Sequence, residues 1–187
     1  MEESSFLNPG KILATSGLHE GMHVADFAAA SGFFVRAAAR LVGPQGSVWA
    51  VDLDREHLPR IKNLATAEGS HHVEVVQGNI AQVKGSHLPD EAMDFIILAN
   101  TLFTHEPKEY AAVLKEVERV LKTGGLALIV DWTDSHGGLG PHPDHVITEA
   151  TCKGLLAKAG LTVVHTTPAG SYHWGLIVRK MVSKTAQ

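Results

Sequence analysis

The chain has 187 residues, of which 44% are hydrophobic and 19% are charged, so it holds enough apolar material for one folded domain, which argues against a disordered chain. The formal net charge of −4, from 16 Lys+Arg against 20 Asp+Glu, gives no strong signal for nucleic-acid binding. The single cysteine, Cys152, excludes an internal disulfide and any zinc site that needs several thiols.

The N-terminal segment, MEESSFLNPG, is acidic and polar, which is unlike a signal or transit peptide. No apolar stretch approaches the roughly 20 residues that span a membrane, so we expect no membrane span and a cytoplasmic location. Residues 8–18 are expected to form one helix, as part of an N-terminal helical cover of residues 1–20.

Short apolar runs that are typical of β-strands alternate with helical patterns along most of the chain. Strands are predicted at residues 22–27, 47–53, 73–77, 93–99 and 126–132. Helices are predicted at residues 33–42, 58–65 (closed by Gly69), 110–121 and 147–159. This alternation indicates an α/β protein with a mostly parallel sheet.

The end of the chain breaks the alternation. Residues 161–166 and 172–179 are two further predicted strands, separated only by a short turn with Pro168 and Gly170. No helix fits between them, so they are expected to pair as an antiparallel hairpin. The predicted fold is therefore a doubly wound, mostly parallel, Rossmann-like α/β sheet of seven strands that ends in an antiparallel hairpin.

In doubly wound sheets the ligand lies beyond the carboxyl ends of the strands, which directs attention to the turn after the first predicted strand. This turn contains Asp26 and then a run of small residues, AAASG, at residues 28–32. The second predicted strand leads to Asp52, whose carboxylate offers two acceptors for the two hydroxyls of a ribose. A small-residue turn followed by such an acid suggests a ligand that contains a nucleoside.

These residues resemble the motifs of class I S-adenosylmethionine-dependent methyltransferases. The pattern from Asp26 to Gly32, Asp-x-Ala-x-Ala-x-Gly, is similar to that family's acid-x-Gly-x-Gly-x-Gly motif. The resemblance continues in order through residues 50–52 (AVD), 78–80 (GNI), 99–100 (AN) and 121–125 (LKTGG). The terminal hairpin is also a feature of that family.

Two further segments are similar to a subgroup of small, single-domain bacterial and archaeal members near the ubiquinone/menaquinone-type methyltransferases. They are the tail YHWGL at residues 172–176 and the Gly140-Pro141 loop. The resemblance implies one methyltransferase-like domain over residues 1–187, with residues 133–146 as a loop on the substrate side.

The resemblance implies S-adenosylmethionine as the cofactor and assigns roles to the matching residues. Asp26 would organise the first turn and the amino group of the methionine part. Asn100, at the end of the fourth strand, would lie by the same amine. The backbone that would run beneath the methionine part belongs to Ala28, Ala30, Ser31, Gly32 and Phe33.

The adenosine part is assigned in the same way. Asp52 would hold the ribose hydroxyls, with Leu53 against the adenine, and Asn79 and the backbone of Ile80 would read the adenine edge. Asn79 stands where the family more often has Asp, and an amide oxygen can still accept a hydrogen bond from the adenine amino group.

Each of these assignments has a structural alternative. Asp26 alone could cap its turn, Asp52 could be a simple strand-end acid, and Asn79 and Asn100 could be ordinary turn residues.

Ala28 and Ala30 replace the family's first and second glycines. Alanine in a left-handed conformation costs about 1–2 kcal/mol, and its methyl group can crowd a ligand. Two outcomes are open: the turn relaxes with both residues at negative φ, or the affinity for the cofactor falls.

Four residues are candidates for acting on the methyl acceptor, because they follow the fourth and fifth predicted strands or lie on the hairpin: His105, Asp131, Tyr172 and His173. A base is needed only where the acceptor must lose a proton, and the imidazole of His105 suits that work. The alternatives are a capping role for His105, hairpin packing for Tyr172 and His173, and hydrogen bonding to a loop for Asp131.

Three of the 12 histidines crowd the predicted loop with two acids: His136, His142 and His145 with Asp134 and Asp144. No helical H-x-x-x-H spacing is present, so we expect no metal site.

The leading hypothesis is a methyltransferase that uses S-adenosylmethionine to methylate an unidentified, small-molecule acceptor. The sequence leaves little chain for a substrate domain, which suggests a small acceptor and a homodimer as one way to complete the pocket. The single cysteine argues against an arsenite methyltransferase, which needs several thiols.

Two alternatives belong to other classes. One is a non-catalytic binding or scaffold protein on the same fold, with cofactor binding weakened by Ala28 and Ala30. The other is a nicotinamide-dependent oxidoreductase, which is disfavoured because the turn lacks G-x-G-x-x-G and Phe33 occupies its last position.

Overall fold

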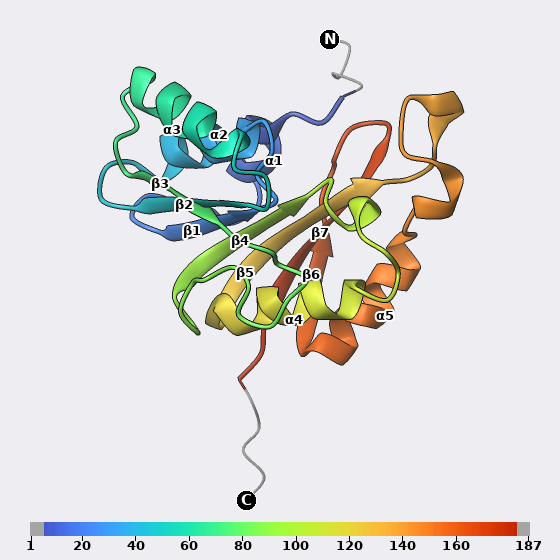
Figure 1. Ribbon diagram of the computed structural model, residues 1–187. Helices are drawn as coiled ribbons and strands as arrows, with labels where there is room; N and C mark the ends of the chain where they lie inside the picture. Colours follow the sequence, from blue (N-terminus) through green and yellow to red (C-terminus); the bar gives the residue numbers. More distant parts are fainter. Residues whose placement is uncertain (1–5, 183–187) are drawn as a thin grey trace, which may run out of the picture.

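The computed structural model describes residues 6–182, which fold around one seven-stranded mixed sheet (Figure 1). The strands are β1 (His23–Phe27), β2 (Ser47–Asp52), β3 (Val73–Gln77), β4 (Met93–Ala99), β5 (Leu121–Trp132), β6 (Leu161–Thr166) and β7 (His173–Lys180). They lie in the order β3-β2-β1-β4-β5-β7-β6. Neighbours from β3 to β5 pair in parallel, whereas β7 is antiparallel to both β5 and β6. The predicted parallel sheet and terminal hairpin are confirmed.

The helices cover both faces of this sheet. They are α1 (Pro9–Ala14), α2 (Phe33–Val42), α3 (His57–Ala67), α4 (Tyr110–Val120) and α5 (Glu149–Ala159). The first three pack into one cluster of buried residues on one face, and α4 and α5 pack into a second cluster on the other. Figure 1 shows these two groups on opposite sides of the strands. Burial on both faces explains why β4 is apolar along most of its length.

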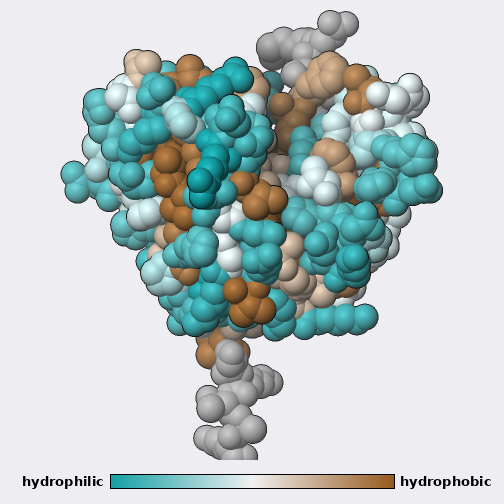
Figure 2. Space-filling model, in the orientation of Figure 1, coloured by the Kyte–Doolittle hydropathy of each residue, from teal (hydrophilic) through white to brown (hydrophobic). Residues whose placement is uncertain are grey.

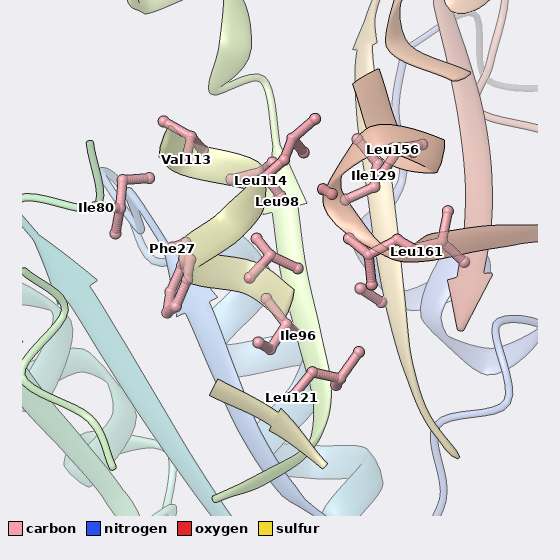
Figure 3. Close-up of a cluster of buried hydrophobic side chains, with 14 of the residues drawn as sticks. Phe27, Ile80, Ile96, Leu98, Val113, Leu114, Leu121, Ile129, Leu156 and Leu161 are labelled. Atoms are coloured by element: carbon pink, nitrogen blue, oxygen red, sulfur yellow. The ribbon is translucent and has the colours of Figure 1, made fainter. Parts of the chain in front are cut away.

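The cluster beneath α4 and α5 fixes the central strands. Val113 and Leu114 on α4 gather over Ile96 and Leu98 on β4, and all four side chains are completely buried (Figure 3). Residues at i, i+3, i+4 and i+7 share one helix face, which is why the periodic apolar residues of α4 all reach the sheet. This packing holds the carboxyl ends of β1, β4 and β5 in place.

One element boundary differs from the prediction. Residues 110–121 were expected to be helical and the fifth strand to start at 126, but the helix ends at Val120 and β5 starts at Leu121. Leu121 has extended dihedral angles and pairs with Met93, and Gly124 at φ 83° then turns the chain before the regular ladder resumes at Phe95 and Leu126. Leu121 continues the apolar period of the helix, so periodicity alone could not find this boundary.

Two helices are shorter than predicted. The helix expected at residues 8–18 covers only Pro9–Ala14, with Asn8 accepting a hydrogen bond from the Lys11 amide at 3.0 Å as the N-cap. The helix expected to start at 147 starts at Glu149, because the Thr148 hydroxyl caps it by accepting from the Thr151 amide. The loop of residues 133–146 contains two short 3₁₀ turns, His136–Gly138 and Pro143–His145.

Within residues 6–182 no helix has the length and apolarity required to cross a bilayer.

Candidate functional site

A cavity of about 490 Å³ lies at the carboxyl ends of the parallel strands, a size typical of small-molecule sites. It is lined by Phe6, Leu7, Pro9, Asp26, Ala28, Ala29, Ala30, Ser31, Phe33, Phe34, Ala99, Asn100, Trp132 and His173. These residues come from the N-terminal segment, the end of β1 and the turn after it, the start of α2, the ends of β4 and β5, and the start of β7. Figure 2 shows the surface notched below the N-terminal segment, with hydrophobic side chains in the notch.

The turn after β1 keeps a left-handed backbone at its alternate positions even though two of them are alanine. Ala28 has φ 58°, Ala30 has φ 43°, and Gly32 has φ 72° as the N-cap of α2. Of the two outcomes left open by the sequence, the one in which both alanines relax to negative φ is therefore wrong. Non-glycine residues in this region store strain that surrounding contacts must hold. Here the amide of Ala29 donates to Val51 at 3.1 Å and that of Gly32 to Ala29 at 2.8 Å.

Gly32 is the one position in this turn where a side chain would also collide. A Cβ built there lies 2.9 Å from Cγ1 of Ile61 on α3. Glycine is therefore required at this position for two reasons: the close packing between the turn and α3, and the positive φ.

Asp52, at the end of β2, ties the turn to its own strand. Its Oδ2 accepts a hydrogen bond from the Ala30 amide at 2.7 Å, and its Oδ1 accepts from the Asp54 amide at 2.9 Å. The Nδ1 of His57, the first residue of α3, lies 3.2 Å from Oδ1. The residue is buried, with 6% of its surface exposed. These contacts fix the carboxylate plane, and His57 is a partner that sequence reasoning missed, because nothing in its spacing marks it.

Asp26 is a second buried acid and lines the cavity. Only 3% of it is exposed, and burial, together with the negative charge of Asp52, raises the pKa of its carboxyl well above the usual range. Two acids so close together favour a ligand with positive charge.

Asn100 follows β4 and also lines the cavity. It has φ 54°, and its backbone N–H donates a hydrogen bond to the Val130 carbonyl at 2.8 Å, which aligns Asn100 with the end of β5. Its Oδ1 is buried and has no hydrogen-bond partner among the described residues. An unpaired buried acceptor in a cavity is a place for a ligand's N–H group.

The residues predicted to hold adenine lie outside the cavity lining. Leu53 is 62% exposed. Phe33, which was predicted to lie beneath the methionine part, does line the cavity; it is 60% exposed, and the Arg36 guanidinium lies 5.3 Å from the centroid of its ring. Asn79 Oδ1 accepts from the Ala81 amide at 3.0 Å, and Ile80 is buried beside it. Leu53 is therefore open to solvent, whereas Ile80 is part of the hydrophobic core.

Of the four residues predicted to act on the acceptor, only His173 lines the cavity. It pairs in the ladder with Trp132, and the two rings lie 4.3 Å apart. Tyr172 instead contacts Phe6 and His136, with ring centroids 5.4 and 4.9 Å away. His136, in the loop after β5, was predicted only as part of a histidine-rich loop and joins this ring cluster.

Asp131 and His105 are held by the backbone near the end of β4. Asp131 accepts from the Trp132 amide at 2.8 Å and the Phe103 amide at 3.3 Å, and burial raises its pKa to about 6 against the lowering effect of these bonds. Nδ1 of His105 lies 3.0 Å from the Thr101 carbonyl. Neither residue lines the cavity, and a role on the acceptor side stays a prediction for both.

A second cavity of about 470 Å³ shares Phe6 and Leu7 with the first and extends between α1 and the turn before β7. The N-terminal segment therefore separates two hollows. In the described part of the chain, no group of three or more His, Cys, Asp or Glu side chains is arranged to hold a metal ion.

Comparison with known proteins places the chain among methyltransferases. A family model described as a methyltransferase domain matches residues 24–125. The demethylmenaquinone methyltransferase of Geobacillus stearothermophilus is 27% identical over 120 residues, which are 64% of this chain and 49% of that protein. The ubiquinone/menaquinone biosynthesis C-methyltransferase UbiE of Laribacter hongkongensis is 31% identical over 121 residues, or 65% and 47% of the two chains.

A solved structure covers more of the molecule. The crystal structure of a SAM dependent methyltransferase from Aquifex aeolicus superposes with a TM-score of 0.83 at 30% identity, over 95% of this chain and 92% of that one. In contrast, the chain spans about half the length of the curated relatives it matches.

Proposed function

The chain belongs to the methyltransferase domain family, as an S-adenosylmethionine-dependent member, and from this premise we propose that it transfers the cofactor's methyl group to a small-molecule acceptor in the cavity. The observation that carries the proposal is the first turn, whose left-handed backbone persists at Ala28 and Ala30. The turn keeps the form that glycine would give it, so its backbone stays open to a ligand.

The residues present suit this cofactor. The orphaned Oδ1 of Asn100 can accept a hydrogen bond from the ammonium group, and the buried carboxyl of Asp26 favours the positive charge. We propose that Asp52 takes the ribose hydroxyls and that Leu53, Asn79 and Ile80 border the adenine. S-adenosylmethionine supplies an already activated methyl group, so the chain's work is to bind and orient.

Calorimetric titration with S-adenosylmethionine and S-adenosylhomocysteine tests the proposal. Both should bind, and Asp52→Ala should weaken both by at least about tenfold, since it removes the ribose contact and the support of Ala30. A native chain that binds neither at millimolar concentration contradicts the proposal.

The acceptor is a separate question. The names of two relatives concern demethylmenaquinone and ubiquinone/menaquinone biosynthesis. We propose a quinone-type ring as the first acceptor to assay, because Phe6, Trp132 and His173 give the cavity aromatic walls. A mass increase of one methyl group on a demethylated quinol would support this choice, and no increase with active cofactor binding would remove it.

His105, Asp131, Tyr172 and His173 remain proposals for the acceptor side, and only His173 has the cavity contact that such a role requires. The homodimer and the cytoplasmic location also stay predictions. Sedimentation velocity of the purified chain tests the first, and fractionation of the source cells tests the second.

A further inference from the structure

His173 carries two polar atoms that the protein does not pair. Only 7% of the residue is exposed, and neither Nδ1 nor Nε2 has a hydrogen-bond partner among residues 6–182. Buried polar atoms in native proteins are nearly always paired, so an imidazole with both nitrogens unpaired needs an explanation. Its position on the cavity wall supplies one: the missing partner is a ligand.

Several polar groups near His173 in the fold already have other partners. Nε2 of His136 lies 2.9 Å from the Thr133 hydroxyl, and the Asp131 carboxylate accepts from backbone amides. Tyr172 uses its carbonyl to accept from the Thr133 amide at 2.9 Å. None of these groups supplies His173 with a partner.

The ring is also uncharged at neutral pH. Burial lowers the pKa of His173 to about 4, and the nearby His136 acts in the same direction. A neutral imidazole has one N–H donor and one lone pair. It can therefore accept a hydrogen bond from a hydroxyl, and it places no positive charge beside a sulfonium cofactor.

We propose that His173 binds and orients the methyl acceptor beside Trp132, with a ring nitrogen accepting a hydrogen bond from an uncharged hydroxyl group of that acceptor. This inference rests on the proposed function, since it assumes that the cavity holds the acceptor. It makes His173 a residue that selects hydroxyl-bearing acceptors over isosteric apolar ones.

Phenol and toluene are matched probes, because they have nearly the same shape and differ only in that phenol carries a hydroxyl group where toluene carries a methyl group. Each is titrated into the full chain with ¹⁵N-labelled histidine, with and without S-adenosylhomocysteine. Phenol should shift the ring-nitrogen resonances of His173, and toluene should leave them nearly unchanged. In His173→Phe, the dissociation constant of phenol divided by that of toluene should rise about fivefold, which is the factor expected for the loss of one hydrogen bond.

His136→Phe is the matched control, because His136 joins the same ring cluster but does not line the cavity. Its phenol-to-toluene ratio should equal that of the native chain. The inference is overturned if phenol leaves the His173 nitrogens unchanged, if it fails to bind, or if both variants change the ratio equally. If His173→Phe does not fold, the native resonances decide alone.

The experiment separates the two proposals. Absence of S-adenosylhomocysteine binding contradicts the proposed function, whereas normal binding of S-adenosylhomocysteine without a phenol response at His173 contradicts only this inference.

Discussion

At the scale of single residues, the first turn shows how a substitution can leave a backbone unchanged. Ala28 and Ala30 hold left-handed dihedral angles that favour glycine, and Ala29 between them has negative φ. The Asp52 carboxylate bonded to the Ala30 amide offsets part of the strain. Two strained alanines therefore flank an unstrained one in the same short segment. Substituting each kind by glycine allows the strain to be measured.

The double variant Ala28→Gly/Ala30→Gly should lose no stability and should gain up to about 1 kcal/mol, because relief of the left-handed strain exceeds the added entropy of the unfolded chain. Ala29→Gly is the control. It should lose about 1 kcal/mol, since a buried residue at negative φ gains nothing from glycine. Urea denaturation of the three proteins gives these values. Equal losses in both variants would mean that the turn is not strained.

Asp26 should make cofactor binding depend on pH. Its pKa is raised in the free protein, so the carboxyl is partly protonated at pH values where an exposed aspartate is ionised. The positively charged ammonium group of S-adenosylmethionine favours the ionised form, and binding must then release a proton. Affinity should rise with pH, by about tenfold per pH unit at most for one proton, and level off above the raised pKa.

Calorimetry between pH 5 and pH 8, in buffers of different ionisation enthalpy, counts the protons released. Asp26→Asn should flatten the pH dependence. A flat profile in the native chain would contradict the prediction, because Asp26 would then keep the same protonation state on binding.

At the scale of elements, one ion network holds the segment between β3 and β4 against α4. Glu116 on α4 is 3% exposed and accepts from the Ser86 amide at 3.0 Å, the Ser86 hydroxyl at 2.6 Å and Arg119 at 2.6 Å. Burial alone would raise the pKa of Glu116, but the bonds from Arg119 and Ser86 outweigh it and lower the pKa. This segment carries Asn79 and Ile80, so the network supports the proposed adenine side.

Glu116→Ala should destabilise the chain by about 3 kcal/mol, because it leaves Arg119 and the Ser86 amide without their buried partner. Glu149→Ala on α5 should cost under about 1 kcal/mol, since the side chains of its ion pair with Lys153 are 37% and 43% exposed. Denaturation curves compare the two. Similar losses would mean that the buried network contributes no more than an exposed pair.

The sequence was sufficient for the type and order of the elements because each predicted strand or helix carries its own apolar period. It was insufficient where two signals overlap, as at Leu121, whose apolar side chain suits both the end of α4 and the start of β5. The start of α5 at the Thr148 cap could be predicted from the sequence only to within a few residues.

The candidate site was predictable where its residues are close in sequence, as in the turn from Asp26 to Gly32. His57 was not marked in this way, and Phe6 and Leu7 were included only in the general N-terminal cover of residues 1–20, because the contacts of all three depend on how distant segments pack. The conformation of Ala28 and Ala30 also needed the structure, since both signs of φ were open to the sequence.

At the scale of the whole molecule, the cavity joins parts of the chain that are far apart in sequence. Its walls come from the N-terminal segment, the β1 turn, the ends of β4 and β5, and the start of β7. A ligand that contacts all of them must stabilise the folded state as a unit, because the unfolded chain has no such site. The thermal transition therefore distinguishes the three functional hypotheses.

S-adenosylhomocysteine at a hundred times its dissociation constant should stabilise the fold by about 2.7 kcal/mol, which corresponds to a rise of about 5–10 °C in Tm for a domain of this size. NADH should leave Tm unchanged, because the turn lacks the glycine pattern of nicotinamide-binding proteins. A shift with NADH alone would favour the oxidoreductase. No shift with either ligand in the native chain, but a shift in Ala28→Gly/Ala30→Gly, would favour the scaffold, because the two methyl groups would then be what keeps the cofactor out.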